Sequence, residues 1–227
     1  MPFSGHDSPL VDPDYPKRTA FVYGDNPDIY RIRGLGVFPR AGLMSIIPAD
    51  LVEAALARRL PLGSIDYAPA ILGVDPAWEG SDRSVVVLRK GIWAKVLFVG
   101  RGLNGERLGN VVIRCQDEHD AAATAIDKTG VGASVCDFLE SQGRPHTRIS
   151  FANSPLDQRF MNRRAEIWWL MREWFEKEVA IDHHQDIKAD LIGPEYGVKD
   201  SGKIYLESKE TMRKRGIASP DIGDDLA

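Results

Sequence analysis

Two short apolar segments of this chain each end on an aspartate that a glycine-containing turn follows, and this repeated pattern limits how the chain can fold. Residues 70–74 lead into Asp75, and residues 121–126 lead into Asp127. Short apolar segments bounded by such turns are typical of buried strands. If the two strands are neighbours in one sheet, both acids lie at the same edge, and open α/β sheets bind ligands beyond the carboxyl ends of their strands. The pattern therefore predicts an α/β sheet with a candidate site at that edge.

The chain from residue 66 onward alternates between strand-like and helix-like patterns. Residues 121–126 fit a strand or a helix, and the turn that follows them favours the strand. The longest helix is predicted over residues 159–178, whose apolar side chains recur at helical spacing and whose tryptophans are expected in the core. The other expected elements are strands over 84–88, 92–99 and 147–151, a hairpin over 196–206, and helices over 133–142, 187–192, 209–215 and 220–227. This order predicts a mixed sheet flanked by helices.

Residues 1–66 differ from the rest of the chain, because they are rich in proline and carry little sustained periodicity. Only residues 49–60 predict a helix, with acidic residues near its start and arginines near its end, as the helix dipole favours. We interpret residues 1–66 as an irregular leader or linker packed on a neighbouring domain, and residues 67–227 as the main domain. A small independent domain is the alternative, but the segment offers little apolar surface for a core of its own.

The composition is that of an ordinary globular protein, with 43% hydrophobic and 27% charged residues. No apolar stretch approaches the roughly 20 residues that a membrane span needs, so no membrane is expected as a partner. The two cysteines, Cys115 and Cys136, make neither a disulfide framework nor a metal cluster, which favours a reducing cytoplasm. The net charge of −4 does not indicate nucleic acid binding, although such binding depends on local rather than total charge.

A third group of acids, Asp221, Asp224 and Asp225, lies in the last predicted helix. Two strand-end carboxylates and one from this helix supply the oxygen ligands that Mg²⁺ prefers, and a pair of such ions promotes phosphodiester cleavage. In the structural alternative, Asp75 is a turn residue and Asp127 caps the following helix. Composition and spacing alone leave both interpretations open.

The expected register of the last helix distinguishes its acids. A helix that begins at Pro220 with Ser219 as its cap places Asp221 in the first turn and Asp224 on nearly the same face. Asp225 is rotated by about 100° from Asp224. Only one of these two adjacent acids is therefore expected to point squarely at the strand ends.

Residues 70–227 contain, in order, the blocks GVDPAWEGSDRSVVVLRKG, IDKTGVGASVCDFL, NRRAEIWWLMREWFEKE and KIYLESKETMRKRGIASPDIGDDLA. This ordered set resembles the nuclease domain of a tailed-bacteriophage terminase large subunit, and the stretch VYGDNPDIYRIRGLGVFP resembles the connection that precedes that domain. The resemblance implies a ribonuclease H-like fold, with a mixed five-stranded sheet flanked by helices. It also implies a metal-dependent endonuclease that cuts concatemeric viral DNA at the start and end of genome packaging.

The resemblance also implies roles for particular residues. Asp75, Asp127 and Asp224 match the catalytic acids that bind two Mg²⁺ or Mn²⁺ ions, and the family pattern selects Asp224 rather than its neighbour. Asp82 matches an acid that supports the first metal, and Lys209 matches a basic residue close to the site. The implied partners are double-stranded DNA, the terminase ATPase portion, the portal and the small terminase subunit, in the host bacterial cytoplasm. The sequence lacks the P-loop pattern of the packaging ATPase, so we expect the nuclease part only.

Basic residues are the candidates for DNA contacts, because a net acidic nuclease needs local cations to hold phosphates. A solvated helix face is the simpler explanation for most of them. The candidates are Arg89, Lys90, Arg163, Arg164, Arg213 and Lys214.

Two other functions are compatible with the same patterns. An actin-like or sugar-kinase-like nucleotide binder also begins with a strand, an aspartate and a glycine turn, but 227 residues leave little room for its second half. A non-catalytic docking module for the packaging motor and portal would keep the acids without using them. A metal-dependent endonuclease remains the leading prediction.

Overall fold

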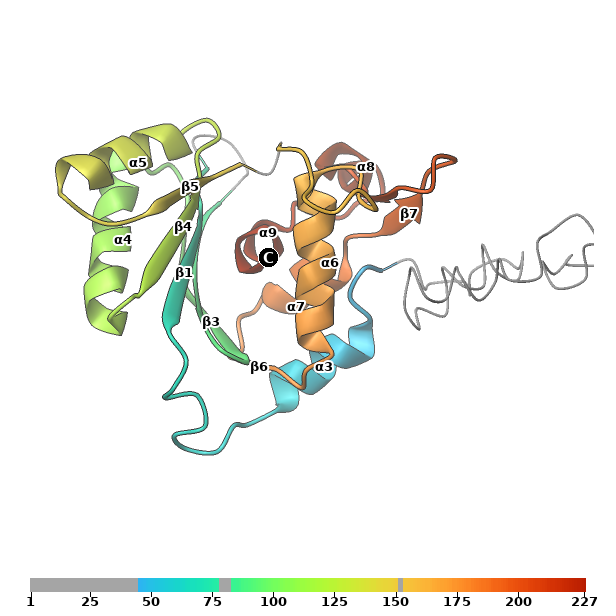
Figure 1. The fold of residues 1–227 in the computed structure, drawn as a ribbon, viewed down its shortest axis with the longest axis horizontal. Coiled ribbons are helices and arrows are strands. Elements are labelled where there is room, and N and C mark those ends of the chain that lie inside the picture. Colours follow the sequence, from blue (N-terminus) through green and yellow to red (C-terminus); the bar gives the residue numbers. More distant parts are fainter. Residues whose placement is uncertain (1–44, 78–82, 151–152) are drawn as a thin grey trace, which may run out of the picture. The chain divides into compact units, whose positions relative to one another are not determined.

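The computed structural model describes residues 45–77, 83–150 and 153–227, and residues from Ser45 onward form one compact unit. The helices are α3 (Ala49–Ala57), α4 (Gly105–His119), α5 (Gly132–Ser141), α6 (Arg163–Phe175), α7 (Ile187–Ile192), α8 (Lys209–Lys214) and α9 (Asp221–Leu226). The strands are β1 (Ala70–Asp75), β2 (Ser84–Lys90), β3 (Trp93–Gly100), β4 (Ala123–Asp127), β5 (Thr147–Ile149), β6 (Ala180–Ile181), β7 (Tyr196–Val198) and β8 (Ile204–Leu206). Figure 1 shows the arrangement of these elements.

The central sheet is mixed and has the strand order β5-β4-β1-β2-β3-β6. Strands β1, β4 and β5 run parallel, whereas β2 is antiparallel to both of its neighbours, β1 and β3. Val74 pairs with Ile126, so the aspartates that follow these residues lie at the same edge of the sheet. The predicted α/β architecture is confirmed, with six strands in this sheet instead of five because the short β6 pairs with β3.

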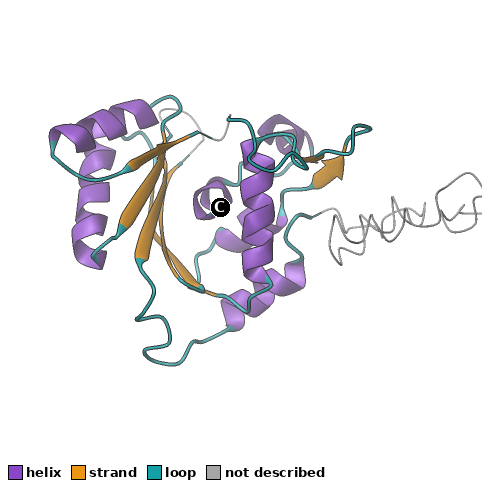
Figure 2. Cartoon of the chain, viewed as in Figure 1, coloured by secondary structure: helices purple, strands orange, loops and turns teal. Residues whose placement is uncertain are grey.

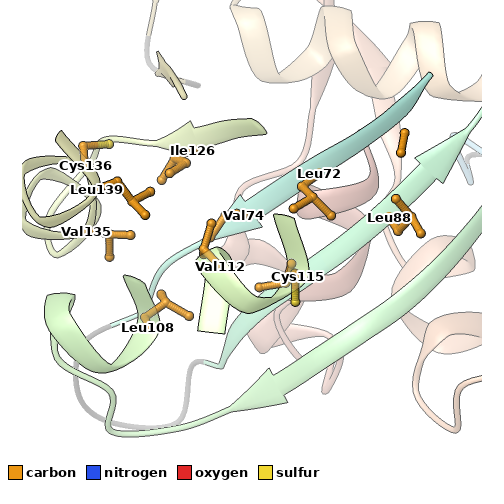
Figure 3. Packing of buried hydrophobic residues seen from close by; sticks show 12 residues of the cluster. Leu72, Val74, Leu88, Leu108, Val112, Cys115, Ile126, Val135, Cys136 and Leu139 are labelled. Carbon is orange, nitrogen blue, oxygen red and sulfur yellow. The ribbon is translucent and has the colours of Figure 1, made fainter. Parts of the chain in front are cut away.

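One face of the sheet is covered by α4 and α5 (Figure 2). Leu72 and Val74 alternate with the residues of β1 that face the other side, as the two-residue period of a strand requires. They pack into a continuous apolar cluster with side chains of α4 and α5, including Leu108, Val112 and Leu139 (Figure 3). This cluster is the apolar core between the sheet and the two helices α4 and α5.

Helix α4 was not predicted from the sequence. Its signals are nevertheless present, because the Asn104 side chain accepts a hydrogen bond from the Arg107 backbone N–H and Leu108, Val112 and Cys115 recur at helical spacing. The buried stripe is narrow and its flanks are polar, which weakens the local pattern. The two-residue strand β6 was also not predicted, since its position depends on pairing with β3.

The opposite face of the sheet carries α9, which contacts β1 and β2, with α6 and α7 beyond it (Figure 1). Gly73 makes this close approach possible, because a Cβ atom there would lie 2.4 Å from the backbone oxygen of Asp225. Helix α6 supplies buried aromatic residues on this side, and Trp168 is fully buried, in agreement with its predicted place in the core.

The boundaries of two segments differ from those predicted. Helix α6 begins at Arg163 rather than at residue 159, because Asn162 caps it and its buried Glu166 holds the preceding turns through the backbone N–H groups of Leu156 and Asp157. The compact unit begins at Ser45, whereas the predicted leader extends to residue 66, because α3 packs against β6, α6 and α7. In the part of the chain that the structure describes, no helix is long and apolar enough to cross a membrane.

Candidate metal centre

The strand-end acids lie where the sheet topology predicts them. Asp75 is the last residue of β1, on the face that α9 covers, and Asp127 is the last residue of the neighbouring parallel strand β4. Oδ1 of Asp127 accepts hydrogen bonds from the backbone N–H (3.0 Å) and the hydroxyl group (2.8 Å) of Thr129, so this acid also shapes its own turn. Gly132 permits that tight turn, because a Cβ atom there would lie 1.8 Å from the carbonyl oxygen of Asp127.

Helix α9 places two further acids at this edge of the sheet, and both lie near the same lysine. The ammonium nitrogen of Lys209 lies 3.1 Å from Oδ2 of Asp224 and 3.7 Å from Oδ1 of Asp221. The shared partner confirms that Asp221 and Asp224 lie on one face of the helix. The start of the helix differs from the prediction: Pro220 is the cap residue, and the hydroxyl group of Ser219 is buried without a hydrogen-bond partner in the described structure.

The electrostatic environment of Asp75 links these groups into one cluster. The pKa of Asp75 is raised to about 7, first by burial and also by the charges of Asp224, Asp221 and Asp127, while the charge of Lys209 opposes this shift. The pKa of Lys209 is raised in turn, since the attraction of the carboxylates outweighs its own burial. Asp75 of β1 and two acids of α9 therefore lie near the ammonium group of Lys209, and Asp127 of β4 lies close enough to act on Asp75.

Asp224 is the most firmly held of these acids. Its Oδ1 accepts hydrogen bonds from Nε of Arg164 at 2.9 Å and from the indole N–H of Trp168 at 2.8 Å. Both donors come from α6, and the carboxylate is almost completely buried, with 3% of its side chain exposed. The sequence predicted Arg164 as a DNA-binding residue, and the structure places its guanidinium group against this buried acid.

A second arginine holds the beginning of α9. The backbone N–H of Arg83 donates to Oδ2 of Asp221, and its guanidinium group pairs with Asp186 and Asp190 of the segment that forms α7. Burial raises the pKa of Asp190 to about 7, although the backbone N–H of Ile222 and the charge of Arg83 oppose this shift. These residues were not predicted as site residues, because the contacts join segments about 100 residues apart and leave no local pattern.

Asp225 points to the sheet on the other side of the helix. A Cβ atom on Gly73 would lie 2.8 Å from its Oδ1, and the backbone N–H of Val87 donates to this carboxyl group. Its Oδ2 is buried without a hydrogen-bond partner among the described residues. Burial raises the pKa of Asp225 well above its usual range, with a further contribution from the charge of Asp75.

The donor set fits a hard divalent cation in its chemistry. All the candidate ligands are carboxylate oxygens, which Mg²⁺ and Mn²⁺ accept, and the gathered negative charge calls for a compensating cation. In the described residues, no group of three or more His, Cys, Asp or Glu side chains is already arranged to hold a metal ion. The ammonium group of Lys209 instead lies beside Asp221 and Asp224.

A cavity of about 420 Å³ adjoins the acids on the α9 side of the sheet. Its lining combines sheet residues such as Ile71 and Val87 with two acids of α9, Asp224 and Asp225. Three arginines complete it: Arg89, Arg148 and Arg163. Arg89, a predicted DNA-binding residue, stacks its guanidinium group 4.5 Å from the ring centre of Trp174, and burial lowers its pKa. Arg163 pairs with Glu166 at 2.9 Å.

The remaining predicted residues fall into three groups. Arg213 and Lys214 are exposed on α8, where Lys214 pairs with Glu210 at 2.8 Å. Lys90 is half-buried at the end of β2. Asp82 lies outside the described residues.

Solved structures provide the comparison with known proteins. No family model matches the sequence, and comparison with curated proteins found no match. The nuclease domain of the large terminase subunit gp2 of bacterial virus Sf6 is 21% identical, with a TM-score of 0.68 over 81% of this chain and 96% of that one. A mutant of the same Sf6 domain has been solved with manganese. The large terminase nuclease of thermophilic phage G20c, solved with bound magnesium, gives a TM-score of 0.61 at 17% identity over 81% of this chain and 95% of that one. The nuclease domain from Thermus phage P74-26 gives a TM-score of 0.52 at 14% identity over 80% of this chain and 92% of that one. The described part of the chain therefore has the fold of these phage large terminase nuclease domains.

Proposed function

We propose that this protein is a metal-dependent DNA endonuclease that cuts concatemeric double-stranded DNA during viral genome packaging. The observation that carries the proposal is the position of Asp75 and Asp224 near Lys209, with Asp127 at the end of the strand that pairs with β1. The fold shared with terminase nucleases solved with manganese and magnesium supports the same interpretation. The proposed partners are the other parts of a packaging terminase and its portal, in the cytoplasm of a bacterial host.

The proposed ligands of two divalent cations are Asp75, Asp127 and Asp224. Cations bound there would lower the pKa of water and stabilise the leaving oxygen of a phosphodiester. Asp75 is the best candidate to serve both ions, because the charges of both Asp127 and Asp224 act on it. Asp127 holds Thr129 with Oδ1, which leaves Oδ2 as its free oxygen in the described structure.

Lys209 has two proposed contributions. Its ammonium group balances the charge of Asp224 and Asp221 before a cation enters, which keeps like-charged groups close together. Because Lys209 lies in their midst, a cation that binds the same oxygens has to displace or reorient it. A lysine beside the acids is also placed to attract the phosphate of the substrate.

DNA binding is proposed to depend on phosphate contacts. The exposed α8 residues Arg213 and Lys214 are the leading candidates, whereas the side chain of Arg164 is engaged with Asp224. Phosphate contacts carry little sequence information, so we expect little sequence preference and a loss of activity as salt concentration rises.

The experiment that tests the proposal is a plasmid cleavage assay without ATP. We expect cleavage of supercoiled and linear duplex DNA in Mg²⁺ or Mn²⁺, and no cleavage after Asp127→Ala or Asp224→Ala. The matched control is Asp117→Ala, which removes an exposed acid from α4 that pairs only with Arg144 in the described structure and should cut normally. Full cleavage in excess EDTA would refute the proposed mechanism.

A further inference from the structure

The two oxygens of Asp224 have different surroundings. Oδ1 accepts two short hydrogen bonds, from Nε of Arg164 and from the indole N–H of Trp168. Oδ2 has Lys209 at 3.1 Å and only a long contact of 3.4 Å with the second guanidinium nitrogen of Arg164. One oxygen is therefore committed to α6, and the other faces the cluster of acids.

The donors to Oδ1 form a fixed pair. Arg164 and Trp168 are four residues apart on α6, which places them on the same face of the helix. Trp168 is fully buried, and only 16% of the Arg164 side chain is exposed. Side chains held this tightly by packing restrict the rotamer of the carboxylate that they contact.

Arg164 also connects Asp224 to the segment that carries Lys209. Its NH1 group donates to the carbonyl oxygen of Glu207 at 3.0 Å, two residues before Lys209. A single guanidinium group thus bonds both to α9 and to the backbone that leads into α8. It can set the position of the acid and of its ammonium partner together.

We propose that Arg164 and Trp168 are positioning residues that hold Oδ1 of Asp224, so that Oδ2 is the oxygen presented to a divalent cation. This inference rests on the proposed function and specifies how one of its ligands is oriented. The sequence predicted Arg164 as a DNA contact, and this inference assigns it to the positioning of Asp224 instead. The role is geometric, because the positive charge of an arginine by itself repels a cation.

The test measures Mn²⁺ affinity by titration calorimetry on the whole protein, without DNA. Arg164→Lys keeps the charge but loses the two-pronged geometry, and Trp168→Phe removes one neutral hydrogen bond. The matched control is Arg172→Lys, which changes another arginine on α6 that pairs with Glu176 instead. Thermal unfolding establishes that each variant is folded, and Arg164→Lys decides the outcome if Trp168→Phe does not fold.

We expect Arg164→Lys to weaken Mn²⁺ binding roughly 10- to 100-fold, as loss of a group that orients a metal ligand does. Trp168→Phe should weaken binding by a smaller factor, and the Arg172→Lys control should bind as the wild type does. Affinity for DNA in EDTA should be the same in all four proteins. Arg164→Asn is expected to weaken Mn²⁺ binding too, although it removes a repelling charge.

Two results would overturn the proposal. Wild-type Mn²⁺ affinity in a folded Arg164→Lys protein would show that Asp224 needs no such support. Weaker DNA binding in EDTA with unchanged Mn²⁺ affinity would return Arg164 to the role of a phosphate contact. If the wild-type protein itself neither binds Mn²⁺ nor cuts DNA, the proposed function fails, which is a different result from equal binding by wild type and variants.

Discussion

The two faces of the central sheet are built from different chemistry. The face under α4 and α5 is an apolar cluster in which Leu72, Val135 and Leu139 are fully buried. The face under α9 carries buried acids, among them Asp221 and Asp224, held by arginines and a lysine. Neighbouring residues of β1 alternate between these two environments.

The apolar face is therefore a source of stability, whereas the α9 face carries the candidate metal ligands. Burial of apolar side chains stabilises the fold, whereas gathering like charges in a partly buried site opposes it. The pKa of Asp75 is raised first by burial and then by the neighbouring carboxylates, and both effects oppose its ionisation in the folded protein. Changes on the α9 face should therefore alter cation binding and cleavage, and changes on the α4 and α5 face should alter unfolding.

The largest effect is expected from Asp75→Ala on the α9 face. Cleavage should fall to background, because this acid is the shared candidate ligand. Metal-free protein should melt at an equal or higher temperature near pH 8, since a buried charge that repels its neighbours is gone. Plasmid cleavage and thermal unfolding in EDTA check both expectations. An unfolded Asp75→Ala protein would mean that the acid is a structural turn residue.

Leu139→Ala on the opposite face should destabilise the fold without changing metal binding. Leu139 is fully buried in the apolar cluster, so its truncation should lower the free energy of unfolding by about 2–5 kcal/mol. Mn²⁺ affinity of the folded protein should not change. Urea denaturation and calorimetry measure the two quantities. Leu170→Ala is the control, because Leu170 is 51% exposed and should cost less than about 0.5 kcal/mol.

The stability of the protein should depend on pH because of the acids on the α9 face, and this dependence can be measured without a large change in structure. The pKa of Asp75 is about 7 in the fold against an ordinary value of 3.8, so the folded state binds more protons between these values. The stability of metal-free protein should therefore fall as pH rises from about 4 to about 7. Mn²⁺ affinity should rise over the same range, because the cation competes with a proton.

Asp75→Asn should reduce this slope but not abolish it, since the pKa of Asp190 is also about 7. Denaturation curves at several pH values in EDTA provide the measurement. A slope that is identical in the variant and the wild type would contradict the assignment of the raised pKa to Asp75.

The smallest effect is expected from Asp225→Asn. Asp225 packs against Gly73 rather than facing Lys209, so most of the cleavage activity should remain. Metal-free stability should change little or rise slightly, because one buried oxygen lacks a partner and the group lies near Asp75. Cleavage rates and melting temperatures of the Asp224→Ala and Asp225→Asn proteins give the comparison. An equal loss of cleavage in both variants would mean that the orientation of α9 does not give the two acids different roles.

Much of the fold could be predicted because its signals are local. The strand-end positions of Asp75 and Asp127 follow from apolar segments and turns, and the parallel pairing of β1 and β4 places both acids at one edge. Helix α4 lacked a wide apolar stripe, and β6 consists of two residues whose strand depends on β3.

The candidate site was predictable only in part. The choice of Asp224 came from a family resemblance and from helix register, not from its environment. Its partner Trp168 is 56 residues away in sequence, and Arg83 is 138 residues from Asp221. Such long-range hydrogen bonds leave no periodic pattern in the sequence. From the sequence alone, a buried tryptophan is therefore predicted only as a core residue, and an arginine only as a surface charge.

Diffraction at the manganese absorption edge from crystals soaked in Mn²⁺ tests the central claim most directly. The account predicts anomalous peaks among Asp75, Asp127 and Asp224, with two ions about 3.5–4 Å apart and Lys209 moved from its place between the acids of α9. Crystals of Asp75→Ala should lose these peaks. A wild-type crystal with no peak at this edge of the sheet, in a protein that still cuts DNA with Mn²⁺, would contradict the account.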